Sequence, residues 1–194
     1  MNVRILVAAL VAAVVVFVWG AIGWAGGLYS FGFKPMPAGN AFAAQLAASV
    51  PESAGYYYPP LPDAAEMTPQ QAELAMQEAN ERFRTGPIML ALVHKGGVDP
   101  QSPTIFLRGF AIEFFACAVL AAIMGIAAKF GARTQDRVAL ALALAAFVVL
   151  GVHGVMWNFL HLPDSFSIAM AIDGFVGWSL AGTVCALIVR PRRS

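Results

Sequence analysis

The chain has 194 residues, of which 59% are hydrophobic and only 12% are charged, and its mean hydropathy is +0.71. Soluble domains carry about 25% charged residues, so this composition excludes an ordinary soluble domain and indicates membrane spans. The net charge of +1 provides no field that would attract nucleic acid. We therefore expect a lipid bilayer as the main surrounding of the chain, and no nucleic-acid partner.

Four long apolar segments follow one another along the chain, at residues 5–24, 109–128, 138–160 and 166–189. Each has the ~20 apolar residues that a helix needs to cross a bilayer, and hydrocarbon cannot satisfy a bare peptide group, so each must be helical. The sequence predicts a mainly α membrane protein: a four-helix transmembrane bundle with a small α+β extracytoplasmic cap between spans 1 and 2. The expected divisions are 1–24 for the first span, 25–107 for the cap and 108–194 for the other three spans, their short loops and a basic tail.

The first apolar segment is expected to be retained as an anchor. A cleaved signal peptide has a shorter apolar region of ~7–15 residues followed by a small-residue cleavage site. Here the apolar run is longer, and Trp19 and Trp24 lie at its end.

Basic residues mark one end of every span. They precede the first span, separate the second from the third and follow the fourth: Arg4, Lys129, Arg133, Arg137, Arg190, Arg192 and Arg193. The other short loop, 161–165, contains no Lys or Arg. Because basic short loops stay in the cytoplasm, both termini are predicted to be cytoplasmic and residues 25–107 extracytoplasmic, in a bacterial cytoplasmic (inner) membrane.

Two helices are expected within residues 25–107. The first covers Asn40–Val50, with Asn40 as its N-cap. The second covers Pro69–Arg84, where Thr68 and Gln71 form a capping-box pattern at the first turn. Its expected buried residues are Leu74, Met76 and Phe83.

The same segment also contains extended stretches. Ile88–His94 predicts a strand, and a return strand is expected to begin at Val98. Tyr56, Tyr57 and Tyr58 precede a proline-rich stretch that favours an extended backbone. These tyrosines are candidates for contact with a partner or with lipid headgroups, although local packing is the simpler interpretation.

The two cysteines are expected to remain free. Measured from the basic ends of their spans, Cys117 lies about 18 Å deep and Cys185 about 7.5 Å, at 1.5 Å per residue. A difference of about 10 Å exceeds the reach of a disulfide.

Three ionisable residues lie well inside the predicted spans: Glu113, His153 and Asp173. Their distances from the basic ends of their spans are about 24, 24 and 25.5 Å, so equal depth is expected. Such groups are costly in hydrocarbon unless they are paired or hydrated. Asn158 and His161, near the end of the third span, are expected to be interfacial anchors with at most an accessory role.

Several interpretations of these three residues stay open. They can satisfy one another as a structural cluster, meet water near the interface, or bind a proton, an ion or a polar ligand. One His and two carboxylates match a facial triad in ligand type only, so no metal site is predicted, and His153 and His161 share one span, which disfavours a haem. No cofactor is expected.

No nucleotide-binding, hydrolase, zinc-protease or redox motif occurs in the sequence. The leading hypothesis is a non-enzymatic accessory, structural or assembly component that acts through its extracytoplasmic cap and its membrane helices, with a membrane-protein partner or a second copy. The alternative is a small binding or transport module that uses Glu113, His153 and Asp173. A membrane enzyme comes third.

Overall fold

In the computed structural model, the described residues are 3–36, 39–60, 62–63, 65 and 67–190. The fold is mostly helical, with a small two-stranded sheet. Four helical segments are long and apolar enough to cross a membrane, as predicted. They cover Val3–Ala25, Pro103–Lys129, Thr134–Phe159 and Asp164–Ile188. The chain divides into two compact units, one with these four segments and one formed by Pro35–Val98.

Two of the four segments change from α-helix to π-helix along their length. The first runs from α1 (Val3–Gly20) into η1 (Ala21–Ala25). The third runs from α5 (Thr134–Val148) through η3 (Val149–Gly154) to α6 (Val155–Phe159). Single π-helical turns within α-helices are rare and often accompany functional sites.

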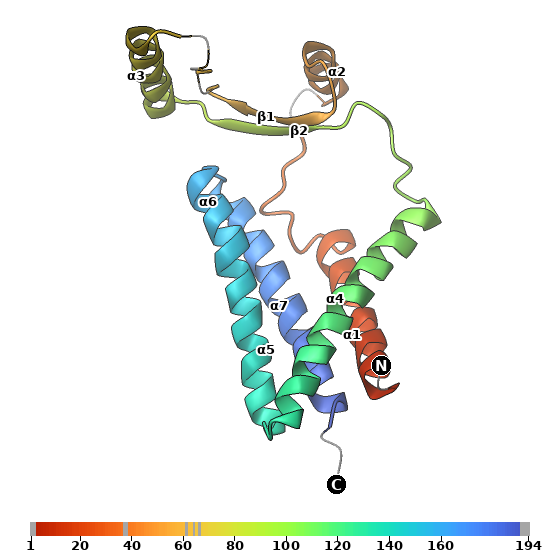
Figure 1. The fold of residues 1–194 in the computed structure, drawn as a ribbon. Helices are drawn as coiled ribbons and strands as arrows, with labels where there is room; N and C mark the ends of the chain where they lie inside the picture. Colours follow the sequence, from red (N-terminus) through yellow and green to blue (C-terminus); the bar gives the residue numbers. More distant parts are fainter. Residues whose placement is uncertain (1–2, 37–38, 61, 64, 66, 191–194) are drawn as a thin grey trace. The chain divides into compact units, whose positions relative to one another are not determined.

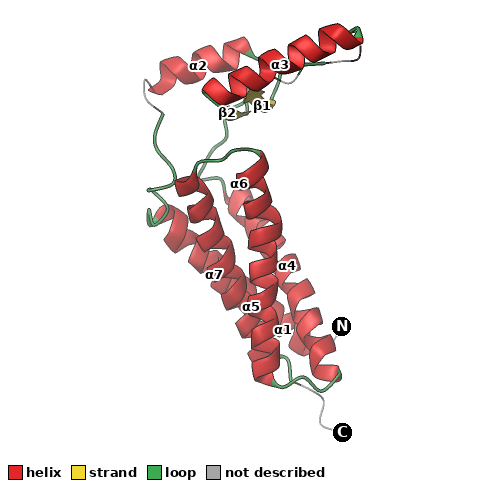
Figure 2. Ribbon diagram, turned by 90° about the vertical axis from the view of Figure 1, so that its left-hand side faces the viewer, coloured by secondary structure: helices red, strands yellow, loops and turns green. Residues whose placement is uncertain are grey.

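Helix α7 (Asp164–Ile188) is the central element of the first unit. It contacts α1, α5, η3 and the remaining long helix, α4 (Pro103–Lys129). Figures 1 and 2 show the start of α1, the end of α7 and the α4–α5 turn at one end of the bundle, which we call the proximal end; the opposite end is the distal end. Small residues dominate the buried core, among them Ala8, Ala12, Ala121, Ala141 and Ala181. Close approach through small side chains is the usual way in which membrane helices associate.

Arg137 connects two helices at the proximal end. Its guanidinium donates to the backbone oxygens of Ala132 at 2.7 Å and Ala186 at 2.8 Å, and to Thr134 Oγ1 at 3.3 Å. The residue is only 1% exposed. It therefore fastens the first turn of α5 to the last turn of α7, a role beyond that of the simple charge marker predicted from the sequence. Arg192 and Arg193, also used as markers, lie outside the described residues.

The second unit contains two helices and the sheet. Strands β1 (Ala54–Tyr58) and β2 (Met89–Val93) pair antiparallel, with Tyr56 opposite Ala91. The prediction of a return strand from Val98 is wrong, because β2 pairs with the earlier tyrosine-containing segment instead. Tyr57 and Leu90 are cross-strand partners on one face of the sheet.

Helices α2 (Gly39–Ser49) and α3 (Pro69–Thr85) lie close to their predicted positions. The capping box of Thr68 and Gln71 is confirmed. Asn40 lies inside α2 and not at its N-cap, because the helix begins one residue earlier. The expected burial of Leu74 and Met76 is wrong, because they are 62% and 44% exposed. The less exposed face of α3 contains Ala79, which is buried, and Ala72, Ala75 and Phe83, which are partly buried.

The two cysteines are free and fully buried, as expected, but the depth argument behind that expectation is wrong. The Sγ atom of Cys185 lies 3.9 Å from the backbone oxygen of Cys117. The long helix α4 crosses α7 and continues to Lys129, so the basic residues at the two helix ends are not at a common depth. Depths counted from those markers therefore carry an error of several ångströms.

Candidate functional site

The carboxylate of Asp173, in the distal half of α7, accepts two aromatic hydrogen bonds. Trp24 Nε1 donates to Oδ2 at 3.1 Å and the Tyr29 hydroxyl donates to Oδ1 at 3.0 Å. Both donors come from the end of the first span and the turn after it, 149 and 144 residues away in sequence. These two hydrogen bonds connect the end of the first span and the turn after it to the distal half of α7.

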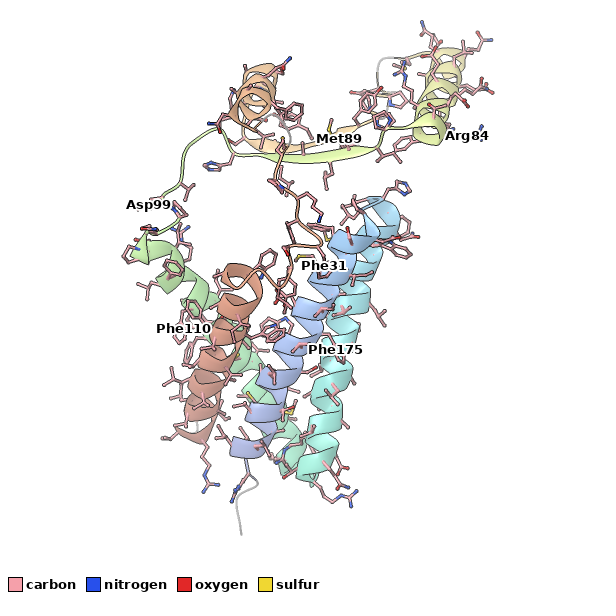
Figure 3. The ribbon with its side chains drawn as sticks, turned by 180° about the vertical axis from the view of Figure 1, so that it is seen from behind. Phe31, Arg84, Met89, Asp99, Phe110 and Phe175 are labelled. Carbon is pink, nitrogen blue, oxygen red and sulfur yellow. The ribbon has the colours of Figure 1, made fainter. Side chains whose placement is uncertain are left out.

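The turn after η1 runs beside α7 and positions Tyr29 next to Asp173. Gly27 has a φ of 76°, which allows the chain to reverse, and a Cβ on Gly23 would collide with the Tyr29 ring. Aromatic packing continues the contact, because the Phe33 ring lies 4.9 Å from Trp24 and 5.0 Å from Phe166 of α7, centroid to centroid. Figure 3 shows this turn, with Phe31 labelled, alongside the distal part of α7.

Tyr29 is held in its neutral form. It is only 2% exposed, and burial raises its pKa from 10.0 to about 12. The hydrogen bond to Asp173 and the charge of that carboxylate act in the same direction, while the nearby indole of Trp19 acts in the opposite one. The phenol is therefore a donor at any physiological pH.

The indole N–H of Trp19 is a buried hydrogen-bond donor without an acceptor. Its ring packs on Gly177 of α7, where a Cβ would lie 3.2 Å from the indole Cδ1. Trp19 Nε1 is buried and makes no well-formed hydrogen bond, although it lies close enough to Tyr29 to influence the phenol. A buried N–H without a partner is costly, so this position suits a small hydrogen-bond acceptor.

Glu113 lies further from the distal end than its predicted depth. It is four residues before Cys117, whereas Asp173 is twelve before Cys185, and the two cysteines are in contact. At 1.5 Å per residue, the eight-residue difference places Glu113 up to about 12 Å nearer the proximal end than Asp173. Side chains lean toward the N-terminus of their helix, which for α4 moves the carboxylate toward the distal end.

The carboxylate of Glu113 remains within reach of the charge on Asp173, and the two repel when both are ionised. Its Oε2 atom is buried and has no hydrogen-bond partner. The equal depth predicted for the three ionisable residues is therefore replaced by a staggered arrangement. In the described part of the chain, no direct hydrogen bond joins any two of Glu113, His153 and Asp173.

His153 approaches α7 from the opposite side. It belongs to η3, and a Cβ on Gly174, the neighbour of Asp173, would lie 3.3 Å from its Nε2. The imidazole also lines a small cavity of about 130 Å³ together with Ser167, whose buried hydroxyl has no partner. The π-helical turn thus places His153 beside the same stretch of α7 that receives Trp24 and Tyr29.

The remaining predicted residues are not part of this arrangement. Asn158 lies in α6 and His161 in the turn after it, where its φ is 51°. In the second unit, Tyr56 donates to the backbone oxygen of Glu52 at 2.8 Å, whereas Tyr57 and Tyr58 are 55% and 41% exposed. Among the described residues, no group of three His, Cys, Asp or Glu side chains is arranged to hold a metal ion.

Sequence reasoning did not identify Trp19, Trp24 and Tyr29 as site residues. The two tryptophans are typical of membrane interfaces in general, and Tyr29 lies in a glycine-rich turn beyond the first span. The available signal was the spacing of aromatic residues just after the first span, which offers N–H and O–H donors at the depth of Asp173.

The chain matches no known protein-family model, no curated protein and no solved structure.

Proposed function

We propose that the chain is an inner-membrane protein of a bacterium with both termini in the cytoplasm and residues 25–107 outside it. The support is the distribution of charge over the bundle. Arg4, Lys129, Arg133 and Arg190 all belong to the proximal end, where α1 begins, α4 turns into α5 and α7 ends. Short basic segments are retained on the cytoplasmic side.

Within this topology, the protein is a small binding module whose polar site lies in the outer half of the bundle and takes up a proton or a small polar ligand. The observation that carries the proposal is the unsatisfied Glu113 Oε2, which lies within the electrostatic influence of Asp173, whereas each oxygen of Asp173 already accepts a hydrogen bond from Trp24 or Tyr29.

The physical reason is the cost of an unpaired charge. An ionised carboxylate without a donor is unfavourable in hydrocarbon surroundings, and the charge of Asp173 adds repulsion to that cost. A proton on Glu113 removes both effects. The buried N–H of Trp19 provides a complementary donor on α1, so a water molecule or another small polar ligand can be held between these groups.

The proposal is tested by infrared spectroscopy of the protein in liposomes. We expect a carbonyl stretch of a protonated carboxylic acid whose amplitude changes with pH and which disappears in Glu113→Gln. The matched control, Glu73→Gln on the exposed surface of α3, leaves the band unchanged. A band that survives Glu113→Gln, or that never titrates, overturns the proposal, and the second result assigns the group a structural role.

A second candidate function, an accessory component that binds a membrane-protein partner, is favoured by the sheet of the second unit. Tyr57, Leu90 and Leu92 lie on one face and are 55%, 38% and 82% exposed. Exposed apolar surface of this kind is typical of interaction sites. Leu92→Ser is expected to abolish co-purification of a partner in mild detergent, while Leu74→Ser on α3, 62% exposed, does not. Equal recovery of the partner with both variants would count against this role.

A further inference from the structure

A pocket of about 370 Å³ lies between the third span and the first half of α7. We call it the α6–α7 pocket. Its apolar wall comes from Val149, Leu150, Ile168 and Ala171. The volume is within the range of ligand-binding pockets.

The surroundings of the pocket decide what can fill it. Leu150 and Ile168 are 70% and 53% exposed, and both belong to helices long and apolar enough to cross a membrane. At such positions the solvent is hydrocarbon. A void lined by apolar atoms loses dispersion contacts unless something apolar occupies it, so a hydrocarbon chain is the natural occupant.

The distal end of the pocket is polar. Asp164, the first residue of α7, accepts a hydrogen bond from Trp157 Nε1 at 2.8 Å, and both residues line the pocket. The loop 161–165 contains no Lys or Arg. The α7 dipole contributes about half a positive charge at this end, which is less than the full negative charge of Asp164, so the net charge at the rim favours a cation.

We propose that the α6–α7 pocket binds a phospholipid with a primary-ammonium headgroup, of the phosphatidylethanolamine type. The ammonium group donates to Asp164 at the rim, and one acyl chain lies along Leu150, Ile168 and Ala171. His153 also lines the pocket. A bound chain therefore touches the imidazole that packs against Gly174, the neighbour of Asp173. The proposal does not depend on the proton-binding role of Glu113.

The test is native mass spectrometry of the protein released from vesicles that contain equal amounts of phosphatidylethanolamine and phosphatidylglycerol with identical chains. The wild type is expected to retain one lipid and to prefer phosphatidylethanolamine about two- to fivefold, the range of an exposed ion pair. Asp164→Asn keeps an acceptor for Trp157 and should still retain a lipid, but without headgroup preference. Asp99→Asn, at an exposed acid before α4, is the matched control and should keep the preference.

A second variant tests the chain-binding part of the pocket. Ala171→Phe fills it and should abolish lipid retention while the bundle stays folded, as judged by continued protection of the buried thiols. If that variant does not fold, the Asp164→Asn comparison alone decides. Equal retention of the two lipids by the wild type, an unchanged preference in Asp164→Asn, or a lipid-free dimer with the pocket occupied by a second copy would each overturn the proposal.

Discussion

The hydrogen bond between Tyr29 and Asp173 allows a quantitative test of how the first span is fixed to α7. Tyr29→Phe removes only the hydroxyl and leaves the buried ring in place. A hydrogen bond to a charged group contributes about 1.5–3 kcal/mol, and Asp173 Oδ1 has no other donor in the described part of the chain. We expect the free energy of unfolding to fall by that amount. Cys117 and Cys185 are fully buried, so their reaction with a fluorogenic maleimide during a reversible detergent titration reports unfolding.

A double-mutant cycle isolates the interaction itself. Tyr29→Phe, Asp173→Asn and the double variant should give a coupling energy of about 1–3 kcal/mol, because the two side chains are in direct contact. Tyr57→Phe, at an exposed tyrosine of β1, is the matched control and should change stability by less than about 0.5 kcal/mol. A coupling energy near zero would refute the assignment of Tyr29 as a donor to Asp173.

The same contact predicts a dependence on alkaline pH. The pKa of Tyr29 is raised in the folded protein to about 12 from 10.0, so the folded state holds the phenolic proton more tightly than the unfolded state. The stabilisation is complete below pH 10 and is lost as the pH rises toward 12. Subtracting the tyrosinate absorbance titration of Tyr29→Phe from that of the wild type should give a midpoint near 12. A midpoint at the ordinary value would show that the phenol is accessible to water.

Three further outcomes are expected in other parts of the bundle. Gly182→Ala should destabilise the protein by about 1–3 kcal/mol in the detergent titration, because the new Cβ would collide with Ala141 of α5. An unchanged stability would mean that α5 and α7 can move apart at this contact without cost. Arg137→Lys should cost about 1–3 kcal/mol, since one ammonium group cannot reach both backbone oxygens that the guanidinium bonds, and unchanged stability would remove its fastening role. A reporter enzyme that is active only outside the cytoplasm should work when fused after Gly97 and fail after Thr134, and the reverse result would invert the proposed topology.

The features of the fold that were predictable are those encoded locally. Apolar length alone identified the four spans, and the pattern Thr68–Pro69–Gln71 identified the start of α3 because a capping box needs only neighbouring residues. The pairing of β1 with β2 was missed, since it joins segments about 35 residues apart and Val98 offered a nearer partner. When each strand is short, the local sequence does not show whether β2 pairs with β1 or with a segment that follows it.

The site was predictable in part for the same reason. Glu113, His153 and Asp173 were visible as ionisable residues within apolar spans. Their relative depth was not, because it depends on how α4 crosses α7, and the two markers used to measure it lie at unequal heights. The donors of Asp173 depend on a turn that reverses at Gly27, a tertiary arrangement without a local signature.

The two π-helical turns also set the angular phase of the residues on their C-terminal side. An α-helix advances by about 100° per residue, and a π turn accommodates one extra residue without breaking the helix. If Val149–Gly154 formed regular α-helix with the same number of residues, each residue of α6 would move by about 100° around the helix axis, and Trp157 would turn away from Asp164. The π-helical turn η3 therefore determines which side chains of α6 face the start of α7.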